Sequence, residues 1–167
     1  MNATGIEQVR TTSNAINRDD WDLVLTSPLG RARETAEILV EHVGFDEIVT
    51  LDLLMERSFG EAEGLSYDQW KSRFSSLDEI PGGESRTQLT QRSQLLLDTI
   101  AASYPGKRIL AISHGALIRT LLAISSNNEL PREGERLGNA SLNIVSHLES
   151  VWSVTKYELE PLSPKDH

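Results

Sequence analysis

The sequence contains no cysteine, and only 5% of its 167 residues are aromatic. Without cysteine, the chain forms no disulfide bond and has no thiolate to serve as a nucleophile or a metal ligand. No apolar run approaches the roughly 20 residues that a membrane-spanning helix needs. The first residues also lack the basic and apolar regions of a signal peptide. We therefore expect a cytoplasmic, soluble protein that does not contact a membrane.

Basic residues are scarce as well, since 16 lysines and arginines face 25 aspartates and glutamates, for a formal net charge of −9. A nucleic-acid partner requires a basic face, so this balance argues against nucleic acid as a partner. A small phosphorylated ligand needs only a local group of arginines, which the composition allows.

Along the chain, segments whose apolar residues are spaced as in strands alternate with segments whose apolar residues are spaced as in helices. They predict strands at 21–27, 47–54 and 108–113, helices at 5–17 and 28–43, a short helix after Ser66, a long helix after Ser85, and a final hairpin around Glu149 and Ser150. Strands that alternate with helices indicate an α/β fold with a mostly parallel sheet and an antiparallel addition. We expect a single domain over residues 1–160 and a loose tail over residues 161–167.

Four sequence signals predict helix starts. They are Thr4 with Glu7, Ser27 with Pro28, Ser66 with Gln69, and Ser85 with Gln88. Three of them are capping boxes, in which the two side chains satisfy backbone N–H groups reciprocally. The pair at 27–28 is instead an N-cap serine followed by a first-turn proline.

The most informative stretch is RILAISHGALIRTLL, residues 108–122, in which a buried strand turns into a helix at His114-Gly115. Ligands of open α/β sheets bind at the carboxyl ends of strands, and a helix start offers free N–H groups to an anion. Because Gly115 has no Cβ, a ligand can approach its backbone, and His114 can donate a hydrogen bond or transfer a proton. The pair is also compatible with a plain helix cap and turn, and both interpretations stay open.

Two further positions lie at predicted strand ends. Arg31 falls in the first turn of a predicted helix, where the helix dipole disfavours a cation. We therefore expect Arg31 to bind a phosphate or a carboxylate, and a solvated side chain is the alternative. For Arg33 we expect a solvated side chain. Glu56 follows an apolar strand end and precedes a loop with two glycines. A carboxyl group there can act as a general acid or base, and a surface salt bridge is the alternative. Glu61 and Glu63 are candidates by residue type alone.

Taken in order, TSPLGRARETA, ERSFGEAEGL, GGES and ISHGALIRTLL resemble the motifs of the histidine phosphatase superfamily, in its phosphoglycerate mutase-like branch. The resemblance runs from residue 2 to about residue 159. It implies a three-layer α/β/α fold with a mostly parallel, mixed sheet and a site at the carboxyl ends of the strands. It also implies phosphoryl transfer to a histidine and then to water or a second substrate, with no metal and no other cofactor.

The resemblance implies roles for four residues. Arg31 would hold phosphate oxygens, and the backbone N–H of Gly115 would assist. Glu56 would protonate the leaving oxygen and then activate water. His114 would hydrogen-bond the phosphoryl group and stabilise its charge in the transition state. These roles agree with the physics of phosphoryl transfer, which depends on positioning and on preorganised positive charge.

The family's Arg-His-Gly motif, whose histidine is the nucleophile, does not occur in the sequence. The other histidines, His42, His147 and His167, lack a preceding arginine and a following glycine. We therefore expect the family's first strand to be missing from the sheet. Three explanations are open: a truncated phosphatase, which we favour, a phosphate binder without turnover, or a sheet completed by rearrangement or by another chain, as in a homodimer.

We predict a phosphatase that acts through a phosphohistidine on a small phosphorylated metabolite and that also binds inorganic phosphate. The alternatives are a phosphoglycerate mutase-type isomerase and a non-catalytic module that binds phosphorylated ligands. Only 57 residues separate Glu56 from His114, which favours the phosphatase because the glycolytic mutases carry longer insertions there. Substrate specificity would come from segments 58–64 and 81–85. A nucleotide-binding fold has no support, because neither glycine-rich phosphate loop occurs.

Overall fold

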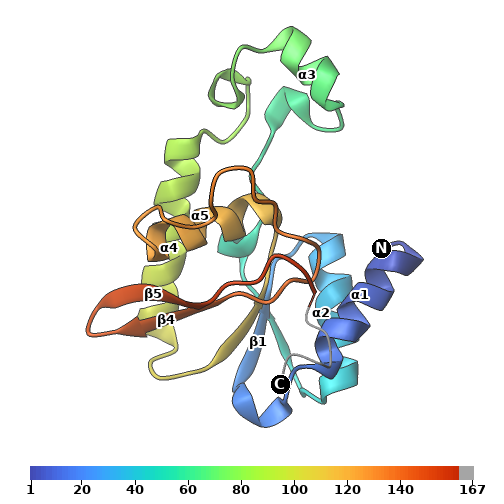
Figure 1. Ribbon diagram of the computed structural model, residues 1–167, viewed down its shortest axis with the longest axis vertical. Coiled ribbons are helices and arrows are strands. Elements are labelled where there is room, and N and C mark those ends of the chain that lie inside the picture. The colour runs from blue at the N-terminus through green and yellow to red at the C-terminus, as the bar shows by residue number, and fades with distance from the viewer. Residues whose placement is uncertain (162–167) are drawn as a thin grey trace.

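The computed structural model describes residues 1–161, and residues 162–167 of the predicted tail lie outside the described part. The central sheet has three parallel strands in the order β2-β1-β3, with β1 at Leu23–Thr26, β2 at Ile48–Thr50 and β3 at Ile109–Ile112 (Figure 1). Leu25 pairs with Val49 on one side and with Ala111 on the other. Parallel neighbours require crossover connections, and helices supply them here.

Helices cover both faces of this sheet, which confirms the predicted three-layer α/β/α arrangement (Figure 1). On one face lies α2 (Gly30–Val43), with α1 (Ala3–Asn14) packed against it, and on the other face lie α4 (Arg86–Ser103) and α5 (Gly115–Ser125). Successive residues of β1 point to opposite faces, so Val24 enters the first core and Leu25 the second. Both side chains are fully buried, which contributes roughly 1.5–3 kcal/mol each to the stability of the fold.

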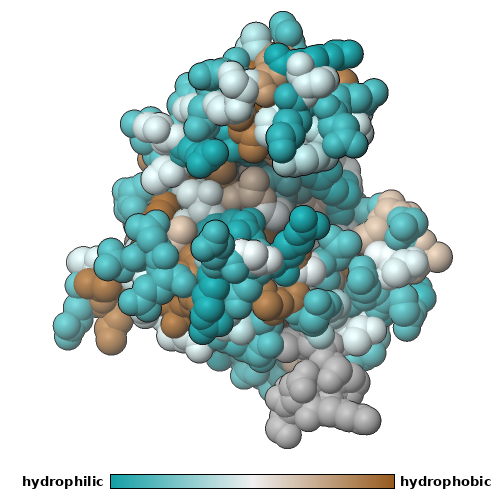
Figure 2. Space-filling view, turned by 45° about the horizontal axis from the view of Figure 1, so that its top comes forward, coloured by the Kyte–Doolittle hydropathy of each residue, from teal (hydrophilic) through white to brown (hydrophobic). Residues whose placement is uncertain are grey.

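The last two strands, β4 (Ile144–Leu148) and β5 (Val151–Lys156), form an antiparallel hairpin that is a sheet of its own. Glu149 and Ser150 connect them with φ values of 49° and 64°, as in a type I′ turn. Leu148 and Val151 give the hairpin an exposed apolar tip (Figure 2). Among residues 1–161, no strand pairs with the edge of β3 that faces away from β1.

Two of the predicted helix starts are confirmed. Ser66 caps α3 (Tyr67–Arg73) and Ser85 caps α4, each in a reciprocal box with the glutamine three residues later. The predicted end of the second helix is also confirmed, since Gly44 closes α2 with φ of 89°. Helix α3 belongs to a lobe, residues 55–85, that extends beyond the three layers at the top of Figure 1.

The other two predicted starts are wrong. Asn2, and not Thr4, caps α1, because the Asn2 side chain accepts a hydrogen bond from a backbone N–H of the first turn at 2.8 Å. Helix α2 begins at Gly30, later than predicted, and has no side-chain cap. The hydroxyl of Ser27 accepts the backbone N–H of Leu29 at 3.3 Å, ahead of the helix, and also contacts His114.

The observed strands are shorter than the predicted ones. The strand predicted at 47–54 ends at Thr50, and the chain then turns so that Leu54 enters the core, where it is 1% exposed. Short 3-10 segments lie at Arg18–Asp20, Asp52–Leu54, Gly60–Ala62 and Leu77–Glu79. In the described part of the chain, no helix combines the length and the apolar character needed to cross a membrane.

Candidate functional site

The carboxyl ends of β1 and β3 lie next to each other, because the two strands are parallel neighbours. This places Ser27, which follows β1, beside His114, which follows β3 and is the N-cap residue of α5. His114 Nε2 lies 2.8 Å from Ser27 Oγ. The side chain of His114 is only 4% exposed, so the junction holds this histidine against the sheet in a fixed orientation.

Arg31, in the first turn of α2, contacts the other nitrogen of His114. Its Nε–H donates to His114 Nδ1 at 3.0 Å. A ring nitrogen that accepts carries no hydrogen, so the neutral imidazole has its hydrogen on Nε2 and donates it to Ser27 Oγ. Burial, followed by the positive charges of Arg31 and Arg92, lowers the pKa of His114 to about 4. His114 is therefore neutral at neutral pH.

Glu56 contacts a second nitrogen of the Arg31 guanidinium. Glu56 Oε2 pairs with Arg31 Nη2 at 3.4 Å, and Glu56 Oε1 accepts the backbone N–H groups of Arg57 at 3.1 Å and Ala116 at 3.3 Å. The N–H of Ala116 belongs to the first turn of α5, where the helix dipole favours a negative charge. Arg31 thus joins the carboxylate and the imidazole that the sequence identifies.

Gly115 is the first residue of α5 and lies at the surface, with open space where a Cβ would be. The structure therefore brings all four predicted site residues to one place, and Arg31, Glu56 and His114 are in direct contact. Their catalytic and phosphate-binding roles remain predictions.

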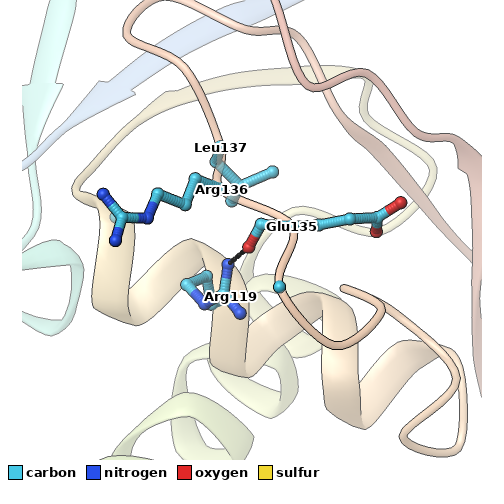
Figure 3. Close-up of a pocket in the computed structure, with 6 residues that line it drawn as sticks. Arg119, Glu135, Arg136 and Leu137 are labelled. Carbon is cyan, nitrogen blue, oxygen red and sulfur yellow. Dashed lines mark hydrogen bonds between the residues drawn. The ribbon is translucent and has the colours of Figure 1, made fainter.

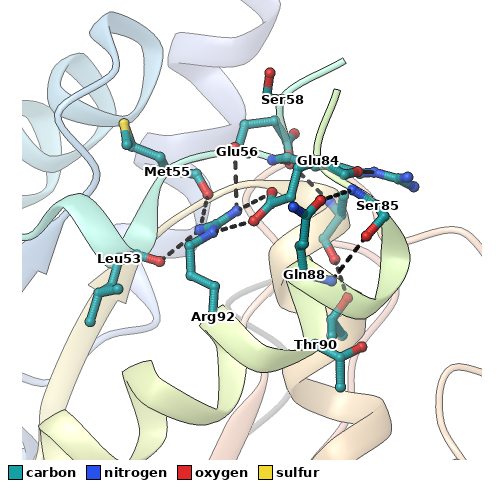
Figure 4. Close-up of polar contacts among 12 residues, drawn as sticks. Leu53, Met55, Glu56, Ser58, Glu84, Ser85, Gln88, Thr90 and Arg92 are labelled. Atoms are coloured by element: carbon teal, nitrogen blue, oxygen red, sulfur yellow. Dashed lines mark hydrogen bonds and ion pairs between the residues drawn. The ribbon is translucent and has the colours of Figure 1, made fainter. Parts of the chain in front are cut away.

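Arg92, on α4, supports the chain just before Glu56 (Figure 4). Its Nη1 donates to the carbonyl oxygens of Leu53 and Met55, each at 2.9 Å. Its Nε and Nη2 bind the two carboxylate oxygens of Glu84, both at 2.7 Å. No local sequence pattern predicts this role of Arg92, although an arginine on the core-facing side of a helix must find polar partners.

Segments 58–64 and 81–85, which we expect to set specificity, lie side by side in the lobe. An isolated bridge joins Phe59 with Gly83. Arg57 is 6% exposed and donates from Nε to a backbone carbonyl of the second segment at 2.7 Å. The two segments therefore form one structural unit next to Glu56.

The remaining candidates lie outside this contact network. Glu61 is exposed, and Glu63 accepts the backbone N–H of Phe59 within its own loop at 2.9 Å. Arg33 is exposed to solvent, and its Nη2 lies 4.0 Å from Glu37 Oε1. Of the other histidines, His42 forms a hydrogen bond with Asn14 and His147 stacks on Trp152. His167 lies outside the described residues.

Residues 1–160 match the histidine phosphatase superfamily, branch 1. The uncharacterized phosphatase PhoE of Bacillus subtilis is 36% identical over 160 residues, which cover 95% of this chain and 81% of that protein. The metal-independent phosphoserine phosphatase of Arabidopsis thaliana is 28% identical, and the alignment covers 94% of this chain and 70% of that protein.

Solved structures with the same fold include Bacillus stearothermophilus YhfR, with a TM-score of 0.82 at 21% identity, covering 93% of this chain and 82% of that one. A mycobacterial glucosyl-3-phosphoglycerate phosphatase in complex with inorganic phosphate has a TM-score of 0.78 at 24% identity, and the match covers 98% of this chain and 87% of that one. Since the family match extends over residues 1–160, this chain belongs to the histidine phosphatase superfamily.

Proposed function

We propose that this protein is a phosphatase, a phosphoric monoester hydrolase that acts on small phosphorylated metabolites. The observation that carries the proposal is the position of Arg31, whose guanidinium contacts both His114 and Glu56. The Arg31 side chain is also 63% exposed, so its planar group can take up phosphate oxygens from solution beside both partners. Relatives named as phosphatases support the same activity.

Binding of a phosphoryl group would change the state of His114. The group would accept the Nε–H of Arg31 that His114 Nδ1 accepts at present, and its negative charge would offset that of the guanidinium. The pKa of His114 would then rise, and Nδ1 would become a donor toward a phosphoryl oxygen. Glu56, which pairs with the same guanidinium, is placed to protonate the leaving oxygen and then to activate water.

The nucleophile has no candidate in the sequence, because the Arg-His-Gly motif does not occur. In this proposal, the nucleophilic histidine lies on a further strand that precedes the present sequence and pairs with the open edge of β3. Such a strand would satisfy the backbone N–H and C=O groups of that edge. Because neighbouring parallel strands end at the same side of a sheet, it would end beside His114. A second copy of the chain at this edge, in a homodimer, is the alternative.

Phosphate binding tests the site itself. We would titrate inorganic phosphate by calorimetry into the chain, the Arg31→Ala variant and the Arg33→Ala variant. Both arginines lie in the first turn of α2 and are about equally exposed, so the two variants change the net charge equally. The expected result is that Arg31→Ala abolishes binding and Arg33→Ala preserves it. Equal binding by all three proteins would mean that the phosphate site lies elsewhere.

A second candidate function, phosphate binding without turnover, is favoured by the missing motif alone. Hydrolysis of an aryl phosphate separates the two candidates. It is measured on the chain itself and on a fusion protein in which an apolar strand ending in Arg-His-Gly is placed ahead of Met1. Phosphate release by the fusion, but not by its Arg-Ala-Gly counterpart, would support the phosphatase. Formation of an isomer from a phosphoglycerate, instead of phosphate, would support a mutase.

A further inference from the structure

The hydroxyl of Ser27 contacts the ring nitrogen of His114 that Arg31 does not contact. Ser27 Oγ lies 2.8 Å from Nε2, and Arg31 Nε lies 3.0 Å from Nδ1. Ser27 is fully buried and His114 is 4% exposed, whereas the Arg31 side chain is 63% exposed. A ligand from solution can therefore replace the contact at Nδ1, but the contact at Nε2 is closed to it.

The hydroxyl of Ser27 uses both of its acceptor positions. A hydroxyl group can accept two hydrogen bonds and donate one. Ser27 Oγ accepts the backbone N–H of Leu29 at 3.3 Å. Because Nδ1 accepts from Arg31, the hydrogen of the neutral imidazole is on Nε2, and Ser27 accepts that hydrogen too. Toward His114, Ser27 is therefore an acceptor.

Two paired strand ends hold this acceptor in place. Ser27 directly follows β1, and its backbone N–H donates to the carbonyl oxygen of Ile112, the last residue of β3, at 3.0 Å. His114 lies two positions after Ile112. The hydroxyl and the imidazole are thus fixed to neighbouring strands of one sheet, and their contact does not depend on a ligand.

The open space at this end of the sheet lies next to α5. A hollow of about 460 Å³ is lined by Gly115 and Arg119, among other residues (Figure 3). Gly115 directly follows His114, and Ser27 does not line the hollow. A ligand can therefore enter beside the residue that follows His114 without disturbing the hydrogen bond between Nε2 and Ser27.

We propose that Ser27 is a positioning residue that enables His114 to become an imidazolium when a phosphoryl group binds at Arg31. This inference rests on the proposed function, because it takes the position of the phosphoryl group from it. On binding, Nδ1 takes up one proton from solvent and donates it to a phosphoryl oxygen, while Nε2 continues to donate to Ser27. A buried, charged N–H group without an acceptor is costly, so the hydroxyl of Ser27 stabilises the charged ring more than the neutral one.

The test is ¹⁵N NMR of the chain with labelled histidine, with and without saturating inorganic phosphate, titrated from about pH 5 to about pH 8, where histidine charge changes occur. Ring nitrogens with and without a hydrogen differ strongly in ¹⁵N chemical shift, and His114→Asn identifies the signals of His114. Without phosphate, only Nε2 should carry a hydrogen at neutral pH. With phosphate, the pKa of His114 should rise, and both nitrogens should carry hydrogen below it.

Two variants test the part that Ser27 plays. In the phosphate complex of Ser27→Ala, proton binding by His114 should be about tenfold weaker than in the unaltered chain, because the charged ring loses one hydrogen bond. Ser113→Ala is the matched control. Ser113 directly precedes His114, but its hydroxyl donates to the carbonyl oxygen of Leu54 at 2.8 Å, so its loss should leave proton binding unchanged.

The outcomes separate this inference from the proposed function. If phosphate binds through Arg31 but only Nδ1 carries a hydrogen in the complex, Ser27 donates to the ring and the inference is wrong, while the proposed phosphate site stands. This result requires no variant. Equal proton binding in Ser27→Ala and Ser113→Ala would lead to the same conclusion. If phosphate acts equally on His114 in the unaltered chain and in Arg31→Ala, the phosphate site itself is wrong, and the inference fails with it.

Discussion

Arg92 and Glu84 form a two-pronged ion pair, in which Arg92 Nε and Nη2 each lie 2.7 Å from one carboxylate oxygen of Glu84. Both side chains are less than one-fifth exposed, at 18% and 16%. The third nitrogen of Arg92 binds the carbonyl oxygens of Leu53 and Met55. Through this one guanidinium, α4 holds both the base of the lobe and the segment that presents Glu56.

Replacing Arg92 with glutamine should destabilise the protein by about 2–4 kcal/mol, because it leaves the partly buried carboxylate of Glu84 unpaired. The measurement is the free energy of unfolding in urea. Arg86→Gln is the matched control on the same helix. Arg86 is 72% exposed and pairs with Asp78 at 3.4 Å, so its loss should cost less than about 1 kcal/mol. Equal losses in the two variants would show that the Arg92 pair does not stabilise the lobe.

The stability of the protein should depend on pH through His114. The pKa of this group falls from 6.5 to about 4 in the folded state. Between these two pH values, the imidazole is protonated in the unfolded chain and neutral in the folded chain. The free energy of unfolding should therefore decrease as the pH falls from about 6.5 to about 4, by roughly 2–3 kcal/mol from this group. Above pH 6.5 the group should have no effect.

His114→Asn provides the comparison for this pH dependence, because asparagine does not titrate. Carboxylates such as Asp22 and Asp78, whose pKa values are lowered by backbone hydrogen bonds from Arg108 and Arg86, are common to both proteins and cancel in the difference. The difference in unfolding free energy between the two proteins should change across this window. Parallel curves from pH 4 to pH 7 would mean that folding does not lower the pKa of His114.

Two glycines of the lobe should respond very differently to alanine. Both have positive φ, but a Cβ on Gly60 would lie 2.2 Å from Pro81 O and 2.4 Å from Gly83 N, whereas one on Gly64 would meet nothing within 4 Å. Gly64→Ala should cost about 1 kcal/mol from backbone strain alone, and Gly60→Ala should cost about 3 kcal/mol or more. Amide hydrogen exchange in segments 58–64 and 81–85 would detect local opening. Equal protection in the two variants would contradict the close packing.

Ser93 should be replaceable with a gain in stability. It is fully buried on α4, and its hydroxyl has no hydrogen-bond partner within residues 1–161. Ser93→Ala removes the unpaired group and adds helix propensity, so the unfolding free energy should rise by about 1 kcal/mol. Ser13 is the matched control, since it is also buried in a helix but donates to Val9 O at 2.8 Å. Thermal unfolding should show no comparable gain for Ser13→Ala, and a loss in Ser93→Ala would indicate a hidden partner.

The sequence by itself determined the features that depend on neighbouring residues. The reciprocal caps at Ser66 and Ser85 form within one turn of their helices. The two-residue turn at Glu149 and Ser150 and the alternation of strands and helices follow equally from local patterns. The ordered motifs likewise identified the family and the four candidate site residues, because residue types and their order are properties of the chain alone.

Tertiary structure decided the contacts between distant residues. Arg31 and His114 are 83 positions apart, and His114 and Ser27 are 87 apart. Ser27 is a good cap by its local sequence, but its hydroxyl accepts the N–H of Leu29 before the helix begins, and the neighbouring strand brings His114 to the same hydroxyl. Arg92 could not be assigned from local patterns for the same reason. A side chain bonds to whatever the packing of the strands and helices places within about 3 Å of it, and sequence spacing does not record that distance.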